Sequence, residues 1–162
     1  PAARWRLDAN EGARLADLDG RGLLAGERLR RYPNAAALEA RLAQEFGIGA
    51  ENVLATAGAD DGLFRACLAY AGGGRRAVYA EPAFEMLTRY LSLAGAELRP
   101  VRERGGKLPI DRLLAEIEKP GAALGLIAVV SPSNPTGSVA SAADLARLSA
   151  AAPEALLLVD LA

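Results

Sequence analysis

Residues 125–137 read GLIAVVSPSNPTG, an apolar run followed at once by a turn of proline, glycine and polar residues. Such a run, bounded by turn residues, predicts a buried strand, with Asn134 in the turn beyond it. A second apolar run, residues 155–159, ends at Asp160. Neighbouring parallel strands would then present an amide and a carboxylate at the sheet edge where open α/β sheets bind ligands. This pair suits a ring that carries both an oxygen and a basic nitrogen.

The composition of the 162 residues excludes several classes of function. A formal net charge of -1 leaves no electrostatic footprint for nucleic acid, and the apolar runs are too short to span a bilayer. The sequence has no histidine, which excludes Ser-His-Asp triads and zinc sites of the Cys/His type within this chain. One cysteine, Cys67, supports no disulfide framework, so we expect a core thiol in a reducing compartment, the cytoplasm.

Short apolar strands alternate with amphipathic helices along most of the chain. We expect an α/β fold, a three-layer αβα sandwich around a mainly parallel sheet. Residues 1–31 read as an ordered N-terminal arm, and residues 32–162 as part of a larger domain. The predicted strands are 53–56, 77–80, 96–101, 125–130 and 155–160. The predicted helices cover 35–46, the residues after Gly58, 84–94, the residues after Pro109, and a stretch that a capping box opens at Ser141.

Six short motifs occur in order along nearly the whole chain. Together they resemble the N-terminal half of a fold-type-I pyridoxal-phosphate (PLP) aminotransferase, and most closely the histidinol-phosphate aminotransferase group. The resemblance implies a PLP-transferase large domain, of which this chain holds a part. The motifs are DANE at 8–11, RYP at 31–33, GADD at 58–61, PAF at 82–84, NPTG at 134–137, and VD at 159–160.

The resemblance assigns the two strand tips to the cofactor ring. Asp160 is similar to the aspartate that pairs with the pyridine nitrogen and keeps it protonated. Asn134 resembles the asparagine that donates to the phenolic oxygen and so tunes the internal imine. On the residues alone, Asp160 could equally cap a turn after its strand, and Asn134 could simply form a turn before Pro135, whose peptide bond could be cis.

Four more residues receive cofactor roles from the same resemblance. The backbone amides of Ala59 and Asp60 would contact the PLP phosphate at a helix N-terminus. Phe84 would stack on the pyridine ring, and Tyr32 would reach the phosphate of the partner subunit in a homodimer. Without the resemblance, a capped helix start and a core aromatic are the preferred interpretations, and a tyrosine packed beside Pro33 is as open as the cofactor role.

None of the motifs contains the lysine that such enzymes need for catalysis. Lys107 and Lys119 are the only lysines, and neither has the family's setting. We therefore expect the Schiff-base lysine and the substrate-binding arginines beyond residue 162, with the rest of the large domain and a small C-terminal domain. The expected substrates are an amino acid and a 2-oxo acid or phosphorylated carbonyl compound, with no nucleic-acid or membrane partner.

Two other functions stay open. A PLP-dependent decarboxylase of the threonine-phosphate type shares this scaffold. A non-catalytic binding domain is the second alternative, because the lysine is missing and Leu161 stands where relatives usually carry glutamate.

Overall fold

The computed structural model describes residues 34–162, which fall into two compact units that divide between Ala55 and Thr56. In the first unit, helix α1 (Ala36–Phe46) is followed by a 3-10 helix, η2 (Ala50–Asn52). Gly47 ends α1 in the left-handed conformation at φ 66°, where its lack of a Cβ avoids strain. The sequence predicted this helix and its terminating glycine.

The predicted strand over residues 53–56 is wrong. Val53 has extended dihedrals, φ -122° and ψ 129°, but residues 53–56 pair with no strand among residues 34–162. Leu54 is 67% exposed. A β-strand needs a hydrogen-bonded neighbour, and a local pattern of apolar residues cannot supply one.

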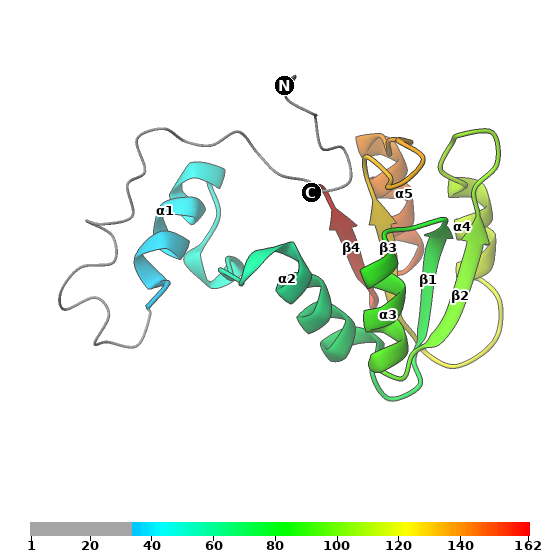
Figure 1. The fold of residues 1–162 in the computed structure, drawn as a ribbon, viewed down its shortest axis with the longest axis horizontal. Helices are drawn as coiled ribbons and strands as arrows, with labels where there is room; N and C mark the ends of the chain where they lie inside the picture. The colour runs from blue at the N-terminus through cyan, green and yellow to red at the C-terminus, as the bar shows by residue number, and fades with distance from the viewer. Residues whose placement is uncertain (1–33) are drawn as a thin grey trace, which may run out of the picture. The chain divides into compact units, whose positions relative to one another are not determined.

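The second unit is built on a four-stranded parallel sheet (Figure 1). Its spatial order is β2-β1-β3-β4, so β1 and β3 are the central strands. The strands are β1 (Arg76–Glu81), β2 (Glu97–Arg102), β3 (Leu124–Val130) and β4 (Leu156–Asp160). The helices are α2 (Gly58–Ala66), which continues into a π-helical turn η3 (Cys67–Ala71), then α3 (Glu85–Leu93), α4 (Ile110–Ile117) and α5 (Ala142–Ala151).

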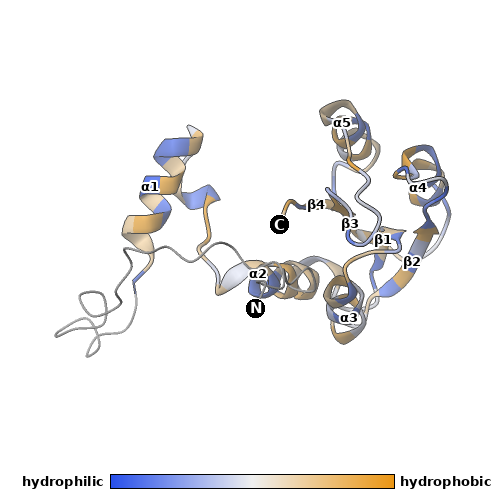
Figure 2. Cartoon of the chain, turned by 45° about the horizontal axis from the view of Figure 1, so that its top comes forward, coloured by the Kyte–Doolittle hydropathy of each residue, from blue (hydrophilic) through white to orange (hydrophobic). Residues whose placement is uncertain are grey.

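Helices cover both faces of this sheet, which confirms the predicted three-layer α/β architecture (Figure 2). Alternate residues of β1 point to opposite faces: Tyr79 packs with α3 and η3, whereas Val78 packs with α4 and α5. Cys67 is fully buried in the first layer, as predicted, and burial raises the pKa of its thiol to about 11. Within residues 34–162, no helix has the length and apolar character to cross a membrane.

The strand order places a topological switch point between β1 and β3. Helix α3 connects β1 to β2, which lies on one side of β1 in the sheet. Helix α4 then connects β2 to β3, which lies on the other side of β1. The connections that leave β1 and β3 therefore diverge to opposite faces of the sheet. In open α/β sheets this divergence opens a crevice beyond the carboxyl ends of the two strands.

Arg76, the first residue of β1, is a buried cation that binds main-chain oxygens. Its guanidinium donates to the carbonyl oxygens of Ala122 at 2.6 Å, Lys119 at 2.7 Å and Ile117 at 3.5 Å. Only 7% of the residue is exposed. The side chain thus satisfies carbonyls at the end of α4 and in the loop that follows it.

We predict that Arg76→Met lowers the free energy of unfolding of the full-length gene product by about 2–3 kcal/mol, since charge-assisted hydrogen bonds are lost and carbonyls are left unpaired. Urea denaturation followed by circular dichroism measures this change. The matched control is Arg89→Met, whose side chain is 62% exposed and pairs with Glu85 at the surface. An Arg76→Met variant as stable as the control would contradict the prediction.

Gly125 stands where the register of β3 against β1 shifts. Arg76 pairs with Leu124, but Ala77 pairs with Leu126, so Gly125 is an extra residue that bulges from the ladder. A Cβ at this glycine would lie 1.9 Å from the carbonyl oxygen of Tyr70. Only glycine lets η3 approach the sheet this closely.

Gly125→Ala should therefore destabilise the protein by about 3 kcal/mol, because the backbone must shift to admit the methyl group. Gly62→Ala in α2 is the control, since the added methyl group would lie 3.4 Å from Thr56 Oγ1, an ordinary van der Waals distance. That change should raise stability by about 0.5–1 kcal/mol. Equal unfolding midpoints for the two variants would show that the bulge tolerates a side chain.

Candidate functional site

The carboxyl ends of β3 and β4 lie at the same edge of the sheet, as the sequence predicted. Val130 pairs with Asp160, and the Ser131 amide donates to the Asp160 carbonyl oxygen at 2.9 Å. Asn134 follows Val130 by four residues, in the turn that leaves this edge. The parallel register therefore brings the two predicted ring-binding residues to neighbouring strand ends.

Asp160 is half-buried, and its carboxylate makes one local hydrogen bond. Oδ1 accepts from the Ala162 amide at 3.0 Å, which is the turn interaction that the residues alone had left open. Oδ2 accepts no hydrogen bond from residues 34–162. One carboxylate oxygen is therefore free to pair with a cationic donor.

Asn134 occupies the exposed tip of a tightly bonded turn. The Ser133 amide donates to the Ser138 carbonyl oxygen at 2.7 Å, and the Gly137 amide donates to the Ser133 carbonyl oxygen at 2.6 Å. The Asn134-Pro135 bond is cis. Ser133 and Ser138 are buried while Asn134 is exposed, so a fixed frame presents a solvent-facing amide.

Helix α2 begins with backbone amides that no described side chain caps. Gly58 has φ 84°, and the two residues after it, Ala59 and Asp60, are exposed. The next carboxylate, Asp61, accepts from Arg65 Nε at 2.8 Å and from the Ala57 amide at 3.1 Å. The bond from Arg65, and secondly that from Ala57, hold the pKa of Asp61 below its usual range. Asp61 is thus occupied elsewhere, and the first-turn amides remain available to an anion.

Phe84 lies between β1 and the start of α3, beside the switch point. It is half-buried and packs against the core layer that contains Leu87 and Leu91. In the same layer the Phe64 and Tyr90 rings pack with centroids 5.3 Å apart and planes at 52°. The core-aromatic interpretation of Phe84 fits this packing, and a stacking role toward a ligand stays a prediction. Tyr32, the remaining predicted site residue, lies outside the described residues.

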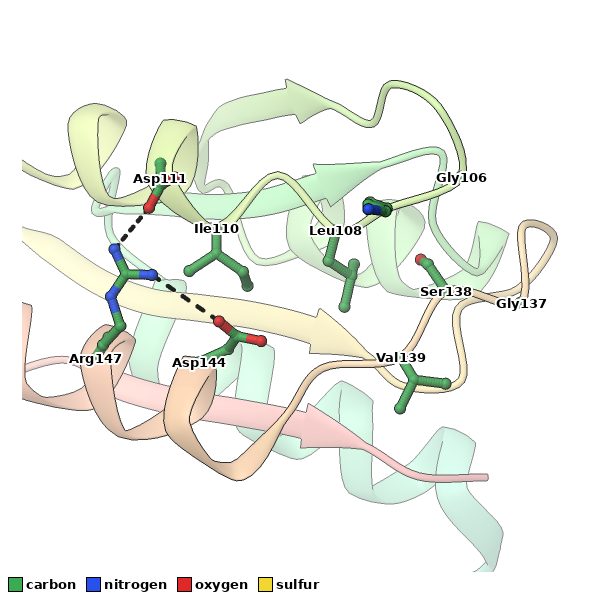
Figure 3. Close-up of a pocket in the computed structure, with 10 residues that line it drawn as sticks. Gly106, Leu108, Ile110, Asp111, Gly137, Ser138, Val139, Asp144 and Arg147 are labelled. Carbon is green, nitrogen blue, oxygen red and sulfur yellow. Dashed lines mark hydrogen bonds and ion pairs between the residues drawn. The ribbon is translucent and has the colours of Figure 1, made fainter.

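A separate surface pocket of about 560 Å³ lies between α4, α5 and the turns that precede them (Figure 3). Arg147 bridges two helices there: it binds Asp111 Oδ1 at 2.6 Å and lies 3.9 Å from Asp144 Oδ1. Its charge is therefore balanced by two carboxylates. Neither Asn134 nor Asp160 lines this pocket, so it is distinct from the two strand tips. In the part of the chain that the structure describes, no group of acidic or cysteine side chains could hold a metal ion.

Glu103 is a further residue at this edge of the sheet, and none of the sequence motifs contains it. This residue directly follows β2, and its Oε2 atom lies 3.0 Å from both Thr136 Oγ1 and Ser138 Oγ in the Asn134 turn. An acidic residue after an edge strand is a common surface feature, so the sequence carried only a weak signal. The contact depends on a strand order that the sequence did not specify.

Comparison with known proteins identifies the family of this chain. The family model for aminotransferase class I and II matches residues 4–162. A curated histidinol-phosphate aminotransferase from Ruegeria sp. is 36% identical over 137 residues, which are 83% of this chain and 37% of that protein. The chain thus spans little more than a third of the length of this curated relative.

Two solved structures share the fold. One is histidinol-phosphate aminotransferase from Sinorhizobium meliloti in complex with pyridoxal-5'-phosphate, with a TM-score of 0.71 and 22% identity over 80% of this chain and 36% of that one. The other is L-threonine-O-3-phosphate decarboxylase from Porphyromonas gingivalis, with a TM-score of 0.65 and 20% identity over 82% of this chain and 38% of that one. With the family match over residues 4–162, the chain belongs to the class I and II aminotransferases.

Proposed function

We propose that the complete protein is a PLP-dependent aminotransferase of the histidinol-phosphate type. It would transfer an amino group between an amino acid and a 2-oxo acid or phosphorylated carbonyl substrate. The observation that carries this proposal is the placement of Asp160 and Asn134 at the ends of adjacent parallel strands. The curated relatives are histidinol-phosphate aminotransferases, which favours that substrate class.

The strand tips fit the two sides of a pyridine ring. The Oδ2 atom of Asp160 would accept a hydrogen bond from the protonated ring nitrogen and keep that nitrogen charged. The exposed Asn134 amide would donate to the phenolic oxygen across the ring. When bound, PLP accepts the electron pair that is released when the substrate Cα loses a proton.

The remaining predicted residues fit the phosphate and the ring face. The uncapped amides of Ala59 and Asp60 would hold the phosphate, and the helix dipole favours an anion at this end. Phe84 follows β1 next to the switch point, from which its ring would shield the pyridine from water. Packing against Leu87 would keep that ring fixed.

The Schiff-base lysine and the arginines that bind the substrate would come from outside residues 1–162. Lys119 is paired with Glu116 at 2.6 Å, and Lys107 lies in the exposed turn beside the separate pocket. We propose that residues 32–162 form part of the large domain, which the rest of that domain and a small C-terminal domain complete. A cytoplasmic homodimer completes the proposal, with Tyr32 reaching the partner's cofactor phosphate as the resemblance implies.

Asp160→Asn in the full-length gene product should slow the half-reaction with glutamate by about 10²–10³-fold, because a neutral amide cannot keep the ring nitrogen protonated. Single-turnover absorbance of the bound cofactor measures this rate. Asp111→Asn, an exposed carboxylate change on α4, is the matched control and should leave the rate unchanged. If both variants react at the wild-type rate, the assignment of Asp160 fails.

Borohydride reduction of the full-length gene product in the presence of PLP should label a lysine outside residues 1–162. Peptide mapping by mass spectrometry locates the label. Lys107 and Lys119 should remain unlabelled, since neither lies at the strand tips. Labelling at either of these lysines, or none anywhere, would refute the proposed enzyme; the second result would favour the non-catalytic binding domain.

The decarboxylase alternative is supported by the fold shared with the threonine-phosphate enzyme. Product analysis separates the two chemistries. A transaminase converts glutamate to 2-oxoglutarate and retains both carboxylates, whereas a decarboxylase releases carbon dioxide from threonine O-3-phosphate.

A further inference from the structure

The carboxylate of Glu103 joins the end of one edge strand to the turn that carries Asn134. Its Oε2 atom accepts from the hydroxyl groups of Thr136 and Ser138, each at 3.0 Å. The two hydroxyl oxygens lie 3.1 Å from each other. One carboxylate oxygen thus binds two side chains of residues 134–138.

This contact spans strands that are not neighbours. Glu103 follows β2, whereas Thr136 and Ser138 follow β3, and β1 lies between these strands. The Glu103 amide also donates to the Glu81 carbonyl oxygen at the end of β1, at 2.6 Å. The main chain and side chain of Glu103 together link the carboxyl ends of three strands, directly over the switch point.

Asn134 lies inside the segment that this contact restrains. The main-chain hydrogen bond between Ser133 and Ser138 closes the turn. Glu103 binds the part of the turn that follows Asn134, at Thr136 and Ser138. Asn134 itself is exposed at the tip of this turn. Its backbone position therefore depends on how firmly the two limbs of the turn are held.

The second oxygen of Glu103 is buried and has no hydrogen-bond partner among residues 34–162. Oε1 accepts no hydrogen bond among the described residues and is inaccessible to solvent. A buried acceptor without a donor lowers stability, and such groups usually need a functional explanation. A charged oxygen binds two hydroxyl donors more strongly than a neutral one does, which offsets this cost.

We propose that Glu103 is a positioning residue that acts through Thr136 and Ser138 to hold the Asn134 amide against the phenolic oxygen of the cofactor. This inference rests on the proposed function, because it needs a cofactor at the strand tips. It adds a residue that none of the motifs contains.

The test uses the full-length gene product with Glu103→Ala and Glu103→Gln. The first readout is the pH midpoint at which the visible absorbance of bound PLP changes. A poorly held amide stabilises the phenolate less, so the oxygen becomes more basic and Glu103→Ala should raise the midpoint by about 0.5–1 pH unit. The glutamine variant keeps an acceptor oxygen and should recover most of that shift.

Two further readouts do not depend on turnover. The dissociation constant of PLP should rise about five- to tenfold in Glu103→Ala. Hydrogen exchange at the amides of Gly137 and Ser138 should become about tenfold faster, because the turn opens more often. Glu116→Ala is the matched control: its carboxylate is 14% exposed and pairs with Arg99 and Lys119 away from the turn.

Asn134→Ala separates this inference from the proposed function. If Asn134→Ala leaves the pH midpoint unchanged, Asn134 does not contact the phenolic oxygen and the ring assignment itself fails. If it shifts the midpoint while Glu103→Ala behaves like Glu116→Ala, only the role of Glu103 is overturned. A double variant should shift no further than Asn134→Ala alone, because both changes remove the same contact.

Variants of the two donors keep the test decisive if Glu103→Ala does not fold. Thr136→Val and Ser138→Ala each remove one hydroxyl that binds Glu103. Each should shift the midpoint in the same direction by a smaller amount. Unchanged midpoints in both Thr136→Val and Ser138→Ala, together with wild-type exchange at Gly137 in these variants, would overturn the proposal.

Discussion

The parallel register between β3 and β4 is the constraint on which the rest of the site depends. Val130 and Asp160 are cross-strand partners, so the two strands end level with each other. Because side chains alternate along a strand, a slip of one residue would turn Asp160 to the opposite face of the sheet. The apolar core prevents that slip: Leu126 and Ile127 of β3 belong to opposite layers, and both are fully buried. Hydrophobic packing on two faces thus fixes the position of a polar group at the edge.

Local sequence patterns correctly predicted those helices and strands whose ends and burial are determined by their own residues. The capping box at the start of α5 is present, with the Ser141 side chain accepting from the Asp144 amide at 3.1 Å. Gly47 and Gly95 end their helices at positive φ, where the sequence ended them. The buried runs of β1 and β3 were also correctly placed, because a strand covered on both faces is apolar throughout. The strand over residues 53–56 failed since its extended backbone has no partner among residues 34–162.

Contacts that depend on strand order could not be read from the sequence. Glu103 and Ser138 are 35 residues apart in the chain, and they meet across β1 because the sheet order β2-β1-β3 places the ends of β2 and β3 only one strand apart. The need for glycine at position 125 could not be read from the sequence either, since it arises from the carbonyl oxygen of Tyr70 on a different element. Asn134 and Asp160 were accessible to sequence reasoning for the opposite reason: each directly follows a strand, and adjacent parallel strands must end at the same edge.

The two strand tips meet opposite physical demands. Asn134 has to remain exposed in order to reach a ligand, yet an exposed loop loses its orientation to conformational entropy. The structure separates these demands within eight residues: Ser131, Ser133 and Ser138 are buried and bonded, while the tip between them is exposed. The Ser131 hydroxyl accepts from the Ala140 amide at 2.9 Å, which closes the base of the turn. A main chain held in this way would lose little further entropy when the Asn134 amide binds, so in the proposed site the hydrogen bond could be directed at one atom of a planar ring. The buried, hydrogen-bonded serines beneath the exposed asparagine would then be the physical basis for specificity at this edge.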